Sequence, residues 1–224
     1  MRGRASFASC AGVTLALVLG ACASHDTTPN VNLDGTSTSP QPQAPFVGDY
    51  PEGPYGLAVG NVFPPITVQG YVGGRAPWAT ISLKDYFDVD GKKGIFGVYV
   101  TVSAPWCAGC VLEGQQLPAL WNNQYKKRGA RLLTVLLQGS AHEAATQATV
   151  DAWIASFGTP YDVGMGDGRS LLPPKPASGP SPSLPYNYAI NPRTMRVAQI
   201  NTGDYFHGDA LPGLDVVLAT NGAP

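Results

Sequence analysis

The sequence has few charged residues and few cysteines. Lys and Arg together number 14 and Asp and Glu number 15 in 224 residues, so the formal net charge is −1. This balance, without a long basic run, argues against a nucleic-acid surface or a polybasic membrane patch. Two of the four cysteines, Cys10 and Cys22, lie at the N-terminus, which leaves one pair in the rest of the chain and argues against a scaffold held by several disulfides. The hydrophobic share of 44% instead fits one globular domain with additional segments.

No apolar run is long enough for a bilayer-spanning helix, which needs roughly 20 residues. The run at residues 11–20 follows Arg2 and Arg4, as in a secretory signal peptide. It ends in Leu-Gly-Ala before Cys22, which resembles the lipobox of bacterial lipoproteins. The resemblance implies a lipoprotein signal peptide at residues 1–21 and a lipid on Cys22. An ordinary signal peptide, or a signal anchor with an incidental cysteine, is the alternative.

Residues 22–55 are rich in Ser, Thr, Pro and Gln and contain few large apolar side chains. Such a segment cannot bury enough surface to fold, so we expect a disordered tether with a reach on the order of 30 Å. The folded domain is expected at residues 56–224. The protein would then face the periplasm from a bacterial membrane, and Ala23 in place of an Asp favours the outer membrane. Disulfides are permitted in that oxidising compartment.

Hydrophobic patterns in the folded part predict alternating strands and helices. The apolar segment at residues 94–103 is typical of a strand buried on both faces. Helix signals follow it, and Ser140 and Glu143 have the spacing of a capping box that would open a second helix. The expected strands are 66–68, 79–82, 94–103, 131–138, 161–163, 186–190 and 195–200, and the expected helices are 108–128, 140–157 and 209–220. Pro212 and Gly213 must either sit in the first turn of the last helix or delay its start. This order of strands and helices predicts an α/β domain.

The sequence Trp106-Cys107-Ala108-Gly109-Cys110 stands between the strongest strand and the first helix. Thiol-disulfide exchange requires one thiolate that attacks a disulfide and a second thiol that resolves the mixed disulfide. A thiol at a helix N-terminus has a lowered pKa because of the partial positive charge there. We therefore expect Cys107 to attack and Cys110 to resolve.

Other uses of a Cys-x-x-Cys pair have less support in this sequence. A structural disulfide that closes a four-residue loop removes little chain entropy and stabilises little. A zinc site needs about four ligands, and only His142 and His207 are available to join the pair. Covalent haem requires a histidine at position 111, which is Val111. Transfer of a soft metal such as Cu(I) stays open, but no metal or cofactor is expected.

The motif resembles the active site of the thioredoxin superfamily, and most closely the exported, membrane-tethered TlpA/ResA type. The resemblance covers about residues 59–220. It implies a thioredoxin fold, with a central mixed β-sheet flanked by helices and an N-terminal β-hairpin extension. It also implies a redox-active disulfide between Cys107 and Cys110, with Trp106 at the surface beside it as a substrate-binding residue.

Two further positions gain a role from this resemblance. Leu184-Pro185, before the strand at 186–190, resembles the family's cis-proline, beside which an extended substrate binds; a trans proline at the start of an edge strand is the alternative. Glu113, one helical turn after Cys110, matches a proton-shuttling glutamate of tethered family members. A solvated carboxylate in the first turns of a helix is the other interpretation of Glu113.

The sequence also departs from the family's pattern. The buried Asp that cytosolic thioredoxins carry six residues before the first cysteine is Thr101 here. The usual proline five residues after the second cysteine is Gln115, with Pro118 three residues later. The dipeptide between the cysteines matches neither cytosolic reductants nor strong oxidants, so the direction of electron flow stays open.

The expected function is dithiol-disulfide exchange with envelope proteins, supplied by an upstream redox partner and without nucleic acid. A peroxiredoxin-like thiol peroxidase is one alternative, but Ala104 and Val100 stand where such enzymes carry a hydroxyl residue and a proline. The other alternative is a non-catalytic thioredoxin-fold module that holds a peptide beside Pro185.

Overall fold

A computed structural model describes residues 49–224, except 167, 175–177, 179–181 and 204–209. The signal peptide and the lipid-bearing Cys22 lie outside the described residues, as does most of the expected tether. Tyr50 falls within the range expected for the tether, yet it is buried and its hydroxyl donates to the Phe63 carbonyl at 2.8 Å. Packing in the described part therefore begins ahead of residue 56.

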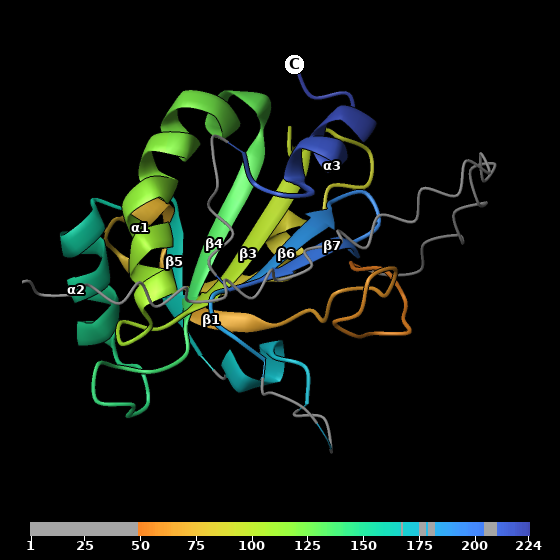
Figure 1. Ribbon diagram of the computed structural model, residues 1–224. Helices are drawn as coiled ribbons and strands as arrows, with labels where there is room; N and C mark the ends of the chain where they lie inside the picture. The colour runs from red at the N-terminus through yellow and green to blue at the C-terminus, as the bar shows by residue number, and fades with distance from the viewer. Residues whose placement is uncertain (1–48, 167, 175–177, 179–181, 204–209) are drawn as a thin grey trace, which may run out of the picture. The chain divides into compact units, whose positions relative to one another are not determined.

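A single mixed sheet of seven strands forms the centre of the domain, in the order β2-β1-β5-β4-β3-β6-β7 (Figure 1). The three central strands run parallel, and the other neighbours pair antiparallel. The strands are β1 (Thr67–Tyr71), β2 (Trp78–Ser82), β3 (Gly97–Ser103), β4 (Ala130–Leu136), β5 (Asp162–Met165), β6 (Tyr186–Asn191) and β7 (Arg196–Thr202). The expected mixed sheet and its N-terminal hairpin, β1 and β2, are confirmed.

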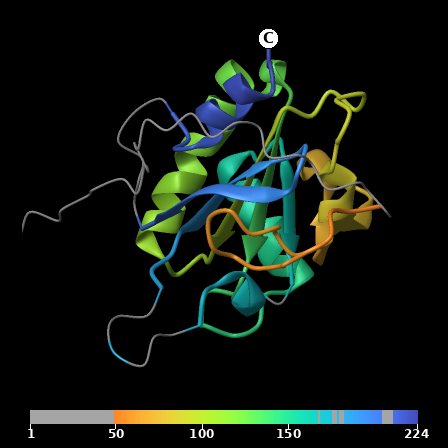
Figure 2. The ribbon, with the colours of Figure 1, turned by 90° about the vertical axis from the view of Figure 1, so that its right-hand side faces the viewer.

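The helices α1 (Ala108–Leu120), α2 (Gln147–Phe157) and α3 (Leu214–Thr220) contribute to one hydrophobic core on the same face of the sheet. The N-terminal segment and the short turn Leu83–Tyr86 pack on a second core on the opposite face. Figure 2 shows α1 and α3 on one side of the sheet and the gold segment around residues 72–86 on the other. The sheet is thus covered on both faces, as the apolar character of β3 predicts.

Helix α1 continues beyond Pro118 into a π turn, Trp121–Tyr125, and a final 3-10 turn, Lys126–Arg128. It ends at Gly129, whose φ of 69° is left-handed. In its middle, Gly114 lets α2 approach closely, because a Cβ there would lie 3.0 Å from the rings of Trp153 and Phe157. The two helices consequently pack tightly beside the active-site turn.

The expected start of the second helix at Ser140 is wrong. The Glu143 carboxylate instead accepts a hydrogen bond from the Ala141 amide at 2.8 Å, and the Glu143 carbonyl accepts one from the Gly139 amide at 2.9 Å. These bonds close a loop, and α2 begins only after Thr146, which makes a reciprocal capping box with Thr149. Local side-chain bonding thus displaced the helix start by several residues.

The last helix has the delayed start that Pro212 and Gly213 allow. Helix α3 begins at Leu214, after Pro212 and a left-handed Gly213 with φ 78°. Proline and glycine here end the preceding loop instead of entering the first turn. Within the described residues, no helix is long and apolar enough to cross a membrane.

Candidate active site

Cys107 and Cys110 form a disulfide where β3 leads into α1. Cys107 is the N-cap of α1, and its sulfur accepts a hydrogen bond from the Cys110 amide at 3.1 Å. Cys107 is 8% exposed and Cys110 is fully buried. The first thiol therefore lies at the positive end of the helix, near the surface, and the second lies behind it.

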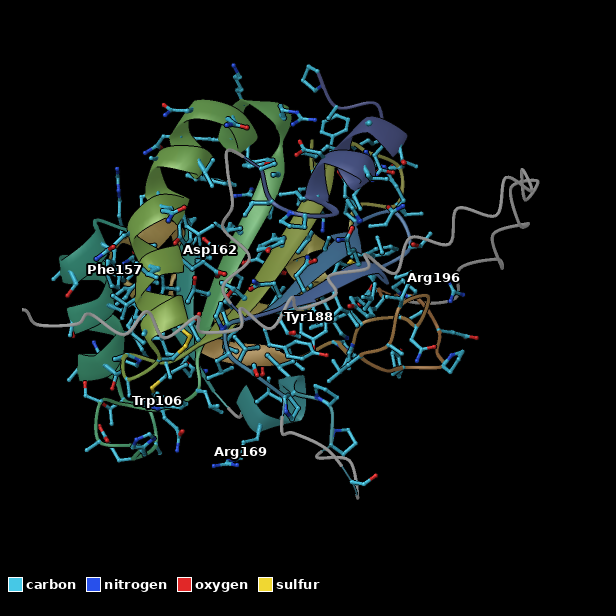
Figure 3. All side chains as sticks on the ribbon, viewed as in Figure 1. Trp106, Phe157, Asp162, Arg169, Tyr188 and Arg196 are labelled. Carbon is cyan, nitrogen blue, oxygen red and sulfur yellow. A yellow bond between two sulfur atoms is a disulfide. The ribbon has the colours of Figure 1, made fainter. Side chains whose placement is uncertain are left out.

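Trp106 lies at the same end of α1 as the disulfide (Figure 3) and is 40% exposed. Its indole packs on the His142 ring with the centroids 4.6 Å apart. His142 belongs to the loop that replaces the expected helix start, and it has a left-handed φ of 66°. The loop and the tryptophan together form one wall beside Cys107.

A pocket of about 440 Å³ adjoins this wall, between the active-site turn and α2. Pro105 and Val111 line it from the turn, and Trp153 and Phe157 line it from the helix. Glu143 adds a carboxylate at its rim. The pocket therefore lies beside the segment that carries Cys107.

The peptide bond between Leu184 and Pro185 is cis. Pro185 is buried and directly precedes β6, whose residue Tyr186 pairs with Val102 of β3. Leu184 packs against the core cluster that contains both cysteines. The structure thus brings the expected proline to the end of β3 from which the Cys-x-x-Cys turn departs.

Glu113 lies on the buried face of α1 and is only 1% exposed. The Thr101 hydroxyl donates to its Oε1 at 2.6 Å, and the Asn187 amide donates to its Oε2 at 2.9 Å. Burial and the negative charge of Glu113 raise the pKa of Tyr99 well above its usual value. The interpretation of Glu113 as a solvated carboxylate is therefore wrong, because the side chain is enclosed by hydrogen-bond donors.

The strand register explains how this carboxylate is held. Asn187 of β6 pairs with Thr101 of β3, and Thr101 pairs with Thr134 of β4. Within this row of paired residues, Thr101 and Asn187 donate to Glu113, on the face of the sheet that α1 covers. The strand thus supplies a hydroxyl donor, Thr101, and the carboxylate comes from the helix.

The sequence did not single out Asn187 or Ser103 as site residues. A signal for Ser103 was available, since Thr101 and Ser103 are polar residues two apart in an otherwise apolar strand. Buried polar side chains require partners, so their spacing indicates a polar contact under α1. Among the described residues, no group of three or more His, Cys, Asp or Glu side chains could hold a metal ion.

Comparison of the sequence with protein-family profiles and with curated proteins finds no match. Solved structures do resemble the domain. A candidate thiol:disulfide interchange protein DsbE from Chlorobium tepidum aligns with a TM-score of 0.51 and 17% identity, over 74% of this chain and 99% of that one. A secreted thiol-disulfide isomerase from Corynebacterium glutamicum aligns with a TM-score of 0.51 and 15% identity, over 70% and 84%.

A third structure, an uncharacterized conserved protein from Geobacillus kaustophilus, aligns with a TM-score of 0.53 and 12% identity, over 75% of this chain and 86% of that one. Identities this low establish the fold and not the reaction. Together with the cysteine pair at the strand-to-helix turn, they show that the chain has the thioredoxin-like fold.

Proposed function

We propose that the protein is a thiol-disulfide oxidoreductase that exchanges disulfides with other proteins of the bacterial cell envelope. The observation that carries this proposal is the placement of the cysteine pair: Cys107 caps α1 near the surface, and Cys110 is buried one turn behind it. In the reduced state the Cys110 amide and the helix N-terminus stabilise a thiolate on Cys107. Two of the structural matches, named as an interchange protein and an isomerase, carry names that describe the same chemistry.

The reaction proceeds in two exchange steps. The Cys107 thiolate attacks one sulfur of a substrate disulfide, which releases one substrate thiolate and leaves a mixed disulfide. Cys110 then loses its proton and attacks Cys107, which releases the second substrate thiolate and forms the Cys107–Cys110 disulfide. Glu113 is the proposed acceptor of the Cys110 proton. Read in reverse, the same steps oxidise a substrate dithiol.

The substrate polypeptide is proposed to lie across the cis Leu184–Pro185 bond and to pair as an extended chain with the backbone of Leu184, because the Pro185 carbonyl already accepts from the Gly203 amide. Trp106 forms the exposed side of this site, and the pocket beside α2 receives residues next to the substrate cysteine. The buried Ala104 supplies no hydroxyl that could bind a peroxide, which favours disulfide over peroxide substrates.

The proposed cellular position rests on the sequence of the N-terminus. Signal-peptide cleavage before Cys22 and its lipidation would anchor the domain through the tether, facing the periplasm and with the outer membrane favoured. The name of the Corynebacterium match describes a secreted protein, which agrees with export. Radiolabelled palmitate should enter the wild-type chain in a bacterial host and not the Cys22→Ala variant, and equal labelling of both would refute the anchor.

The exchange function is tested with the full-length chain in which Cys10 and Cys22 are replaced by serine, so that only the active-site thiols remain. The reduced protein should cleave insulin disulfides when a dithiol is supplied. Cys107→Ser should abolish the reaction, and Cys110→Ser should accumulate the mixed disulfide. If Cys107→Ser keeps full activity, the mechanism is wrong. If instead the protein binds peptides with the same affinity whether Cys107 and Cys110 are reduced or oxidised, a non-catalytic module is supported.

A further inference from the structure

A second hydroxyl adjoins the bond between Thr101 and Glu113. The Oγ atoms of Thr101 and Ser103 lie 3.2 Å apart, and either could donate by geometry alone. Both residues are buried, at 0% and 1% exposure. They belong to β3 and point to the same face of the sheet, because alternate residues of a strand share a face. Ser103 therefore continues the polar contact from Glu113 toward the end of the strand.

The number of hydroxyl protons determines which residue donates in the Thr101–Glu113 and Thr101–Ser103 hydrogen bonds. Thr101 has one hydroxyl proton, and it donates that proton to the ionised carboxylate of Glu113 at 2.6 Å. In the 3.2 Å contact, Thr101 can then only accept, so Ser103 is the donor. The Ser103 oxygen keeps lone pairs that can accept a proton from a further group.

Asn187 decides which oxygen of Glu113 takes up a proton. Its amide N–H donates to Oε2 at 2.9 Å and keeps that oxygen an acceptor. The remaining oxygen, Oε1, faces the Thr101 hydroxyl. A proton that reaches Glu113 is thus placed on Oε1, at the end of the hydroxyl pair.

Strand and helix geometry places Ser103, the other end of the hydroxyl pair, on the Cys110 side of Thr101. In α1, Cys110 precedes Glu113 by one turn, a rise of roughly 4.5 Å along the helix axis. In β3, Ser103 follows Thr101 by about 6.6 Å. The chain reverses direction between β3 and α1, so Ser103 is nearer than Thr101 to the first turn of α1, which contains Cys110. The register partner of Ser103, Leu136, packs in the same cluster as Cys110.

We propose that Ser103 and Thr101 form a proton wire between the Cys110 thiol and Glu113. The proposal rests on the exchange function proposed above and adds two positioning residues to it. When Cys110 attacks the mixed disulfide, its S–H proton passes to the Ser103 oxygen, the Ser103 proton to Thr101, and the Thr101 proton to Oε1 of Glu113. The new sulfur–sulfur bond joins Cys110 to Cys107, and the substrate sulfur leaves with the electron pair of the broken bond.

The wire also works in reverse. With Glu113 protonated, Oε1 donates to Thr101, Thr101 donates to Ser103, and Ser103 donates to the Cys110 thiolate that forms when the disulfide opens. Only the orientations of two hydroxyl groups change between these states. Protonation of the buried cysteine therefore requires no water beside it and no movement of α1.

Oxidised glutathione separates the two chemical steps. With the reduced full-length chain carrying serine at positions 10 and 22, the first phase is bimolecular attack by Cys107, and the second is unimolecular attack by Cys110. The fluorescence of the neighbouring Trp106 follows both phases by stopped flow. Ser103→Ala and Thr101→Val should slow the second phase by about tenfold or more and leave the first phase within about twofold.

Two variants provide matched controls. Thr101→Ser keeps the hydroxyl and should restore most of the second-phase rate that Thr101→Val loses. Thr134→Val makes the same isosteric change on the neighbouring strand, in register with Thr101, and should leave both phases unchanged. The reduction potential of the cysteine pair should be the same in Ser103→Ala as in the wild type, because this variant removes the path of the proton and leaves the Thr101 and Asn187 hydrogen bonds to Glu113 in place.

The outcomes separate the wire from the exchange function. A wild-type second phase in Ser103→Ala, or a Thr101→Ser rate as slow as that of Thr101→Val, refutes the wire while exchange stands. Slowing in Thr134→Val equal to that in Thr101→Val also refutes it, since general loosening of the core would then explain the effect. If the wild-type chain reacts neither with oxidised glutathione nor with insulin, the exchange function and the wire are both wrong.

Discussion

The hydroxyl of Thr101 donates a 2.6 Å hydrogen bond to the carboxylate of Glu113, and both side chains are buried between β3 and α1. A buried carboxylate is costly unless donors surround it. Here the donors come from two adjacent strands in register, Thr101 on β3 and Asn187 on β6. The arrangement places an acid–base group one helical turn from the buried cysteine, within the core.

Removal of the Asn187 donor should change the pH dependence of exchange. In Asn187→Ala, the ionised form of Glu113 loses one hydrogen bond and is stabilised less, so the carboxylate takes up its proton at a higher pH. The pH profile of the second phase with oxidised glutathione should therefore move to higher pH. A profile that coincides with the wild type would show that Glu113 does not control this step.

The contact between Trp106 and His142 should affect substrate capture. His142→Asn removes the ring and still tolerates the left-handed backbone, so it isolates the loss of the stack. An aromatic pair contributes about 0.5–1.5 kcal/mol, and kcat/KM for insulin should fall about two- to tenfold. The second phase with glutathione should not change. Unaltered kcat/KM, together with unaltered Trp106 fluorescence, would contradict a role for the stack.

The start of α2 predicts different effects of two cap substitutions. Thr146→Ala removes the observed N-cap and should lower the free energy of unfolding by about 1 kcal/mol. Ser140→Ala alters the exposed residue that the sequence alone favoured as the cap, and should change it by less than about 0.5 kcal/mol. Urea unfolding of both variants and of the wild type measures these free energies. The reverse ranking would place the helix start at Ser140.

Asp88 should link stability to acid pH. Burial alone raises the pKa of its carboxyl, but the amides of Ile95 and Lys93 and the guanidinium of Arg193 outweigh burial and hold the pKa below the usual 3.8. For an acid with a depressed folded-state pKa, the stabilisation is present above the unfolded pKa. It is lost as the pH falls through the folded value.

The Asp88→Asn variant tests this link. It should lower the free energy of unfolding at pH 7 by about 1–3 kcal/mol, because the amide cannot replace every charged hydrogen bond. Its stability should also decline less steeply than that of the wild type below about pH 4. Thermal unfolding between pH 2 and pH 7 gives both quantities. Parallel curves for the two proteins would exclude Asp88 as the linked group.

Much of the fold was predictable because strong local signals agreed with the tertiary packing. The apolar run of β3 and the Cys-x-x-Cys turn located the centre of the sheet and the helix after it. The start of α2 was not predictable, since Ser140 and Glu143 have the spacing of a capping box but bond within a loop. The same spacing of Ser140 and Glu143 fits a capping box and a hydrogen-bonded loop, so the sequence alone does not distinguish the two.

Some features of the candidate site could likewise be predicted from local sequence, and others could not. The roles of Cys107 and Cys110 follow from local sequence, and the surroundings of Glu113 depend on which strands become neighbours. Asn187 lies 74 residues from Glu113, and only the pairing of β6 with β3 brings the two together. Long-range register of this kind could not be derived from single-sequence patterns.

The central claim is that Cys107 and Cys110 form a reversible redox couple, and a thiol-trapping titration tests it most directly. The full-length chain with serine at positions 10 and 22 is equilibrated with poised dithiothreitol or glutathione buffers and then alkylated. We predict one two-electron transition between about −120 and −300 mV, with a value below about −220 mV indicating a reductant and one near −120 mV an oxidant. A pair that stays wholly reduced or wholly oxidised across the range would contradict the exchange mechanism.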